Sequence, residues 1–348
     1  MAINLNQLKE DVKDKMFFRN RRLQSRLPLA FPMVLNVELT NICTENCIWC
    51  PREAMTRPKG FMKFELFKKV IDEASGFPKL RKLFMHWMGE PLLHPEFMKF
   101  AEYAKNKDVA EAIEIATNGV ALTEDKMKRM IELGIDELFI SIDAATSEKY
   151  TSLKNTDNFR TIQENIDRAA KLKKALRAKL PFIRVKFLET DANIEQKKQF
   201  KDRWAGTADS VFFEKDLSVW NAKSEKVNKN IGQMECYRRN YGNLTKRYPC
   251  DRLWYLLAVH WDGKVSPCVC DWNGEDTIGD LNYQTIEELW RGDVLMKYRA
   301  HHINNEYNKI SVCDVCTKWG TRNMGDWLLR HKERALSEPK MSKILNQL

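Results

Sequence analysis

Three cysteines, Cys43, Cys47 and Cys50, stand in one short stretch of the sequence at C-x3-C-x2-C spacing. They directly follow an apolar run, residues 33–39, that we expect to form a buried strand. A loop of this length can bring three thiolates to one metal centre, and three thiolates suit an iron–sulfur cluster with one iron left open to a small molecule. Zinc usually has four closed ligands, and no histidine or fourth cysteine lies nearby in the sequence. The spacing therefore predicts a cluster, and three unrelated core cysteines are the alternative.

The whole loop, from Thr40 to Pro51, resembles the cluster-binding motif of the radical S-adenosylmethionine (radical SAM) superfamily. Trp49 matches the aromatic residue that often precedes the last cysteine of that motif. The resemblance implies a [4Fe–4S] cluster on the three cysteines, with S-adenosyl-L-methionine (AdoMet) bound at its open iron and Trp49 beside the cofactor.

A glycine-containing turn follows the next expected strand, which covers residues 80–87. Its residues Gly89, Glu90 and Pro91 resemble the Gly-Gly-Glu-Pro motif that holds the amino group of AdoMet, with Met88 in place of the first glycine. Glycine allows a ligand to approach the backbone closely. The position of the turn, after a cysteine loop and a strand, supports a cofactor-binding role.

Polar residues also end the third and fourth expected strands. Thr117 and Asn118 end the third, and Ser141 and Asp143 end the fourth. These positions resemble superfamily positions near AdoMet, which implies that Ser141 and Asp143 lie toward its ribose or carboxylate. An acid at a strand end can accept hydrogen bonds from ribose hydroxyls, although ordinary loop capping also explains such residues. Three further residues could face the same cavity: Lys186, Glu189 and Asn193.

A second set of four cysteines, Cys250, Cys268, Cys313 and Cys316, lies in the C-terminal third of the chain. Four thiolates suit either an iron–sulfur cluster or zinc. This region resembles the auxiliary-cluster domains called SPASM and twitch. The residues that carry the resemblance are Trp261-Asp262-Gly263, Pro267-Cys268, residues 278–281, Leu289-Trp290, Arg299 and residues 313–316. Because the denser cysteine run of a full SPASM domain is missing, the resemblance implies the twitch type, with one auxiliary [4Fe–4S] cluster on these four thiolates.

Two cysteines remain, Cys236 and Cys270. A spare thiol is usually a small buried hydrophobic residue. Cys270 lies two residues from a predicted ligand, so it could replace that ligand, and either thiol could donate a hydrogen atom during catalysis.

The elements that position these residues alternate between strands and helices from residue 33 to residue 214. The expected strands are residues 33–39, 80–87, 112–116, 137–142, 182–188 and 210–214, and the expected helices are residues 64–73, 95–106, 124–133, 161–176 and 194–203. Alternation at this spacing predicts βαβ units around a parallel sheet. Six units are too few for a closed eight-fold barrel, and the superfamily resemblance implies an α/β fold with an open, partial (βα)6 TIM-like barrel.

We divide the chain into a barrel, an auxiliary-cluster domain and their flanking segments. The predicted segments are an N-terminal helical extension at 1–32, the barrel at 33–215, a linker at 216–249, a small α+β iron–sulfur domain at 250–320 and a C-terminal helix at 321–348. Within the small domain, Asp262-Gly263 predicts a hairpin between residues 256–261 and 264–268, followed by helices at residues 285–291 and 295–301. The tail, residues 324–337, is expected to form one amphipathic helix.

Composition narrows the class of protein. The 348 residues contain no run of eighteen apolar residues, and residues 1–23 are too charged for a secretory signal, so we expect a soluble, cytoplasmic protein. Nine cysteines in such a protein favour metal binding or catalysis over disulfides. The net charge of +10 is spread along helices, which favours an ordinary solvated basic surface over nucleic-acid binding. An acidic electron donor or an anionic substrate is the functional alternative.

Together these features predict a radical SAM oxidoreductase. We expect a 5′-deoxyadenosyl radical to take a hydrogen atom from a small polar substrate such as a sugar, cyclitol or nucleotide sugar, with the second cluster accepting an electron in a dehydrogenase reaction. A flavodoxin- or ferredoxin-type protein is the expected electron donor. The alternatives are an epimerase that uses a spare thiol, a peptide-modifying maturase, and a zinc-stapled interaction protein.

Overall fold

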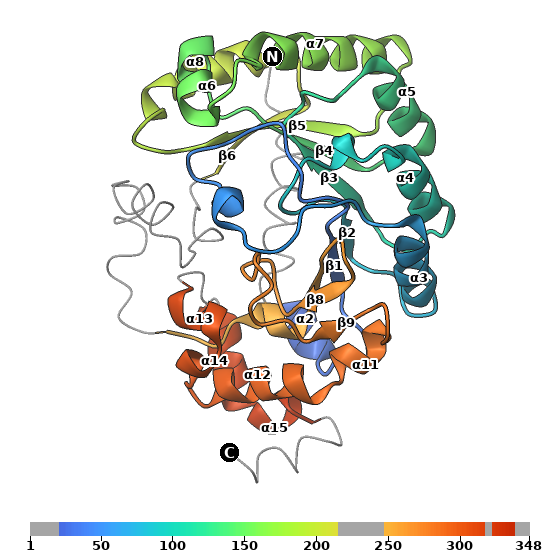
Figure 1. Cartoon of the computed structure of the whole chain (residues 1–348), viewed down its shortest axis with the longest axis vertical. Helices are drawn as coiled ribbons and strands as arrows, with labels where there is room; N and C mark the ends of the chain where they lie inside the picture. Colours follow the sequence, from blue (N-terminus) through green and yellow to red (C-terminus); the bar gives the residue numbers. More distant parts are fainter. Residues whose placement is uncertain (1–20, 215–246, 317–321, 338–348) are drawn as a thin grey trace.

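A nine-stranded sheet organises the protein, as seen in a computed structural model that describes residues 21–214, 247–316 and 322–337. The strand order is β6-β5-β4-β3-β2-β1-β7-β8-β9 (Figure 1). Cys236 and nearly all of the predicted linker lie outside the described residues. Of the N-terminal extension, the structure describes residues 21–32, which include α2 (Arg21–Arg26). No helix in these ranges is long and apolar enough to cross a membrane.

The first six strands are parallel and form the predicted partial barrel. Their bounds are β1 (Val34–Val37), β2 (Lys82–Phe84), β3 (Ile113–Thr117), β4 (Glu137–Ser141), β5 (Phe182–Leu188) and β6 (Ser210–Glu214). The helices that cover its outer side are α3 (Phe64–Ser75), α4 (Phe97–Asn106), α5 (Glu124–Leu133), α6 (Ser147–Lys154), α7 (Phe159–Ala175) and α8 (Lys197–Trp204) (Figure 1). The expected α/β architecture is thereby confirmed, and only α6 was not predicted.

The two faces of these strands differ in character because successive side chains of a strand point to opposite faces. On the outer face, residues such as Leu83, Ile115 and Val185 are fully buried in the core beneath the helices. The inner face is polar: the Lys82 ammonium lies 2.8 Å from a Glu114 oxygen and 3.1 Å from a Glu137 oxygen. The strand register thus directs a row of polar side chains into the barrel.

The C-terminal part continues the same sheet. Its elements are β7 (Leu256–Val259), β8 (Lys264–Ser266), β9 (Gly279–Asp280), α11 (Ile286–Trp290), α12 (Asp293–Ile303) and α13 (Ser311–Val315). The predicted hairpin is confirmed, since β7 and β8 pair antiparallel around Gly263, whose φ of 97° suits glycine. However, β7 also pairs in parallel with β1, so the sheet crosses the predicted boundary between barrel and iron–sulfur domain.

The prediction of one continuous helix in the tail was wrong. Residues 322–335 form two helices, α14 (Arg322–Arg330) and α15 (Lys332–Ala335), and His331 leaves helical geometry between them. Tertiary hydrogen bonds hold the second helix in place. The Arg334 guanidinium donates to the Leu27 carbonyl at 2.9 Å, and the Trp254 indole donates to the Ala335 carbonyl at 3.0 Å.

Candidate active site

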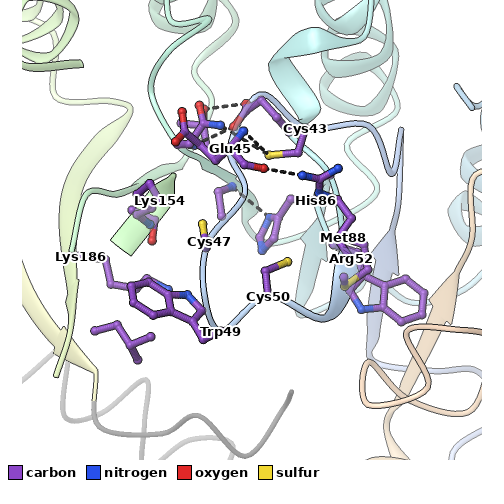
Figure 2. Close-up of a pocket in the computed structure, with 18 of the residues that line it drawn as sticks. Cys43, Glu45, Cys47, Trp49, Cys50, Arg52, His86, Met88, Lys154 and Lys186 are labelled. Carbon is purple, nitrogen blue, oxygen red and sulfur yellow. Dashed lines mark hydrogen bonds between the residues drawn. The ribbon is translucent and has the colours of Figure 1, made fainter. Parts of the chain in front are cut away.

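The three cysteines of the first motif line one cavity of about 300 Å³ at the carboxyl ends of the barrel strands. Figure 2 shows Cys43, Cys47 and Cys50 gathered around a common space, with Trp49 and Lys154 beside it. The end of α6 anchors their loop, because the Ile48 N–H donates to the Leu153 carbonyl at 2.9 Å. The unpredicted helix α6 is therefore what holds the cysteine loop against the barrel.

The donor set fits an iron–sulfur cluster. Burial raises the pKa of the Cys43 and Cys50 thiols to about 12, so the positive charge of the irons has to draw off their protons. Among the described residues, no three cysteine, histidine or acidic side chains lie close enough to share one metal ion. A four-iron cluster holds its thiolates farther apart, because each thiolate binds a different iron.

The Gly-Glu-Pro turn packs directly on the cysteine loop. The Glu90 N–H donates to the Ile42 carbonyl at 2.8 Å. A Cβ on Gly89 would lie 2.6 Å from the same Ile42 oxygen and 2.8 Å from the Asn41 Cα, so only glycine fits here. The two motifs that the resemblance links to AdoMet are thus in backbone contact.

We expect Gly89→Ala to lower the affinity for AdoMet by tenfold or more, about 1.4 kcal/mol. The added methyl meets backbone rather than flexible side chains, so the turn and the cysteine loop have to separate. Isothermal titration of the reconstituted protein with AdoMet measures the change. Gly76→Ala is the matched control, because its Cβ would meet nothing closer than the Glu73 carbonyl at 3.3 Å. Equal AdoMet affinity in the two variants would contradict this account of Gly89.

Glu90 is buried and receives three hydrogen bonds. Thr117 Oγ1, the Asn118 N–H and the Leu92 N–H donate to its carboxylate at 2.7, 2.6 and 3.0 Å. Burial nevertheless raises the pKa of Glu90 to about 7, since desolvation outweighs these bonds. A bound ammonium group would favour the charged carboxylate, which is what the predicted contact with the AdoMet amino group requires.

The structure brings most of the predicted cofactor residues to the cavity. Those that line it are Trp49, Gly89, Glu90, Thr117, Asn118 and Ser141, together with Lys186. Asn118 also bonds the cysteine loop, since its amide donates to Thr44 Oγ1 at 2.9 Å. Pro91, Asp143, Glu189 and Asn193 are not among the lining residues, and their proposed contacts with AdoMet stay predictions.

Asp143 lies behind the cavity wall, where it holds other residues. It accepts hydrogen bonds from the Leu188 N–H at 2.7 Å and from Ser141 Oγ at 2.9 Å, and it forms an ion pair with Lys154. Burial lowers the pKa of Lys154, but Asp143 and Cys47 raise it further, so the net pKa lies above its ordinary value. Asp143 thereby positions Ser141 and a cationic Lys154, and both of these residues line the cavity.

Several lining residues were missed from the sequence. They are Asn36, Glu45, Arg52, His86, Trp87, Met88, Ala116, Lys154, Leu188, Glu214 and Val269. Asn36, His86 and Glu214 belong to the inner face of the sheet and could have been found by extending the alternation of each strand past its apolar core. Lys154 had no such signal, because it lies at the end of α6.

The second cysteine set also converges in space. All four predicted ligands line one smaller pocket, and Cys270 lines it as a fifth cysteine. Cys250 precedes a short 3-10 helix at Asp251–Trp254, Cys268 follows β8, and Cys313 lies in α13 with Cys316 just after it. This donor set suits a fully ligated cluster, as predicted, and it leaves Cys270 beside the ligands rather than at the first cavity.

The two sites meet at one short segment of the chain, residues 268–270. Val269 lines the first cavity, whereas its neighbours Cys268 and Cys270 line the second pocket. The Trp87 indole, which lines the first cavity, donates to the Val269 carbonyl at 3.1 Å. Arg57 also connects the barrel to the iron–sulfur domain. It forms an ion pair with buried Glu38 and donates to the Trp272 carbonyl at 2.8 Å. The two candidate metal sites are therefore held back to back.

Comparison with known families agrees with this geometry. Residues 37–189 match the family model of the radical SAM superfamily, and residues 250–317 match that of SPASM, an iron–sulfur cluster-binding domain. The chain therefore belongs to the radical SAM superfamily and carries a SPASM domain. It is a radical SAM enzyme, with AdoMet and iron–sulfur as its cofactors.

Two relatives align with most of the chain. The tungsten-containing aldehyde ferredoxin oxidoreductase cofactor-modifying protein of Pyrococcus furiosus is 29% identical over 328 residues, which cover 84% of this chain and 91% of the relative. The S-adenosyl-L-methionine-dependent 2-deoxy-scyllo-inosamine dehydrogenase of Niallia circulans is 22% identical over 286 residues, which cover 81% and 92%.

Solved structures share the fold. BtrN in complex with AdoMet and 2-DOIA matches with a TM-score of 0.52 and 19% identity, over 83% of this chain and 93% of that one. Streptococcus suis SuiB bound to precursor peptide SuiA matches with a TM-score of 0.61 and 13% identity, over 95% and 79%.

Proposed function

We propose that the protein is a radical SAM dehydrogenase that oxidises an alcohol carbon of a small polar substrate, such as a sugar or cyclitol, to a ketone. The observation that carries this proposal is that the two cysteine sites meet at residues 268–270, where Val269 lines the first cavity and Cys268 and Cys270 line the second pocket. The likeness to the inosamine dehydrogenase over most of both chains supports it.

The chemistry divides between cofactors and side chains. When bound, AdoMet on a reduced cluster supplies a radical that removes a hydrogen atom from a C–H bond, and an oxidised second cluster supplies an electron acceptor. Glu90, with Asn118 and Trp49, would hold AdoMet in place. The substrate hydroxyl still has to lose a proton, and the Glu214 carboxylate in the cavity wall is the base that we propose for it. The substrate thus loses a hydrogen atom from carbon, a proton from oxygen and one electron, which together equal the two hydrogens that separate an alcohol from a ketone.

Lys186 forms an ion pair with this proposed base. Its ammonium lies 3.2 Å from a Glu214 oxygen, and both side chains come from the inner face of the sheet. By contrast, burial lowers the pKa of His86 to about 4, and its Nδ1 accepts a hydrogen bond from the Ala116 N–H at 3.0 Å. The His86 ring is therefore neutral, with its acceptor nitrogen already used, which leaves Glu214 as the better base.

Placement also weighs against Cys270 as the hydrogen donor of an epimerase. Within the described residues, the cysteines lining the first cavity are Cys43, Cys47 and Cys50, which the cluster would occupy. Cys270 lies in the second pocket instead. An epimerase would therefore depend on Cys236, which lies outside the described residues.

A second candidate substrate is an organic cofactor rather than a free sugar alcohol. The relative from Pyrococcus furiosus, which aligns over 84% of this chain, is named as a cofactor-modifying protein. The same hydrogen abstraction and oxidation would then act on a hydroxyl of that cofactor. A small, acidic one-electron donor of the flavodoxin or ferredoxin type suits the net charge of +10 in either case.

We expect the product to be two hydrogens lighter than the substrate and to carry no solvent deuterium. The test incubates the reconstituted enzyme in D2O with a panel of cyclitols and sugar alcohols, follows 5′-deoxyadenosine formation, and determines product masses. A dehydrogenase removes hydrogen from carbon without returning it. A product of unchanged formula that carries one deuterium would instead establish an epimerase, since an exchangeable thiol would have supplied the hydrogen.

A further inference from the structure

The second pocket contains two nitrogen donors directed at cysteine sulfurs. The first is Arg252, which follows Cys250 by two residues and is partly buried. Its guanidinium donates to Cys270 Sγ at 3.4 Å, and it interacts electrostatically with Cys250 and Cys268. A guanidinium keeps its charge at every pH at which proteins fold. The pocket therefore holds a permanent positive charge among its sulfurs.

The second donor is His302 of α12, which is buried and bridges two of the predicted ligands. Its Nδ1 lies 3.1 Å from the Cys250 backbone nitrogen and accepts that N–H. Nδ1 therefore carries no proton, so the neutral ring carries its proton on Nε2, which lies 3.3 Å from Cys313 Sγ. The imidazole thus donates one N–H to a ligand sulfur.

Other charges around the pocket are of both signs, since the Asp276 carboxylate, which accepts the Val312 N–H, also acts on Cys313. Arg247 also lines the pocket, donates to the Cys313 carbonyl and stacks 4.2 Å from the Tyr307 ring. Asp251 lies close enough to interact electrostatically with both Arg252 and Cys250. Removing Arg252 would therefore leave any charge on Asp251 facing the sulfurs.

We propose that Arg252 and His302 are positioning residues that raise the reduction potential of the second cluster, so that it accepts an electron readily. Positive charge and N–H donors at the sulfurs stabilise the reduced cluster, which carries one more negative charge than the oxidised one. Residues outside the ligand set thus decide the direction of electron flow. The inference rests on the second cluster that the proposed function requires, but not on the identity of the substrate.

The test measures the midpoint potential of the second cluster by electron paramagnetic resonance during an anaerobic redox titration. The full-length chain with Cys43, Cys47 and Cys50 changed to alanine serves as the background, so that only the second cluster contributes signal. At the midpoint potential of this background, Arg252→Met should lower the ratio of reduced to oxidised cluster about tenfold, a shift of about 59 mV. Arg252→Lys, which keeps the charge but not the fork of donors, should shift the potential less.

The histidine provides an independent pair of variants. His302→Leu removes the donor to Cys313, and we expect a lower potential, whereas His302→Gln retains an N–H and should stay closer to the parent. Arg160→Met is the control for net charge, because Arg160 lies 91% exposed on α7, and it should leave the potential unchanged.

Two results would overturn the inference. One is an unshifted potential in Arg252→Met with iron content intact. If that variant fails to bind iron, an unshifted potential in His302→Leu with iron content intact would overturn it equally. Failure of the proposed function looks different, because the product would then keep the formula of the substrate and carry solvent deuterium, whereas the potential of the second cluster is measured without substrate.

Discussion

Changing any one of Cys43, Cys47 and Cys50 to alanine is expected to abolish the formation of 5′-deoxyadenosine from AdoMet. Each cysteine supplies one of the three thiolates that the described residues bring to the cavity, so the loss of one leaves a cluster with two of these ligands. High-performance chromatography of reaction mixtures with dithionite as reductant measures the nucleoside. Iron analysis should show a loss of about four of eight irons, if two four-iron clusters form.

The matched control for this experiment is Cys270→Ala, a cysteine of the second pocket outside the predicted ligand set. It removes a buried thiol of the same size and should leave 5′-deoxyadenosine formation near the wild-type rate. Near-normal cleavage of AdoMet in a triple Cys43, Cys47 and Cys50 variant would rule out the assignment of the first cluster.

Changing Cys313 and Cys316 together to alanine is expected to abolish the oxidised product while AdoMet cleavage continues. Both thiols line the second pocket and neither lines the first cavity, so only the second cluster should be lost. The substrate radical then has no electron acceptor beside it and cannot become a ketone. Mass spectrometry of the product and chromatography of 5′-deoxyadenosine, run on the same sample, separate the two effects.

Metal analysis of the same proteins distinguishes zinc from an iron–sulfur cluster at the second site. If the second set bound zinc, the wild-type protein would contain about four irons and one zinc per chain, and the double variant would lose only the zinc. A normal yield of oxidised product from the double variant would exclude the second site as the electron acceptor.

The sequence predicted the site well where spacing along one loop decides the geometry. Cys43, Cys47 and Cys50 share a cavity because eight consecutive positions after a strand cannot spread far. The strand bounds at Phe182–Leu188 and Ser210–Glu214 also match the expected ones. Glu90 was found for the same reason, since its turn follows directly on a strand.

What the sequence did not predict depends on contacts between distant segments. Helix α6 has a short, weakly amphipathic sequence, and its role appears only when Leu153 receives the N–H of Ile48. Nor does the Leu256–Val259 segment carry any signal for its partner, because an apolar strand could pair with many others. The distance between the two cysteine sets is likewise a tertiary property.

The pairing of β7 with β1 has a consequence for how the molecule can be divided. With β2 on one side and β7 on the other, β1 has no open edge, although six βα units alone would leave it at the end of the sheet. A fragment that stopped before β7 would expose the backbone N–H and C=O groups of this apolar strand to other chains, which favours aggregation. The cysteine loop would then follow an edge strand of the fragment, because it comes directly after β1. The barrel and the iron–sulfur domain match two separate family models, but their shared sheet makes them a single unit for folding and for expression.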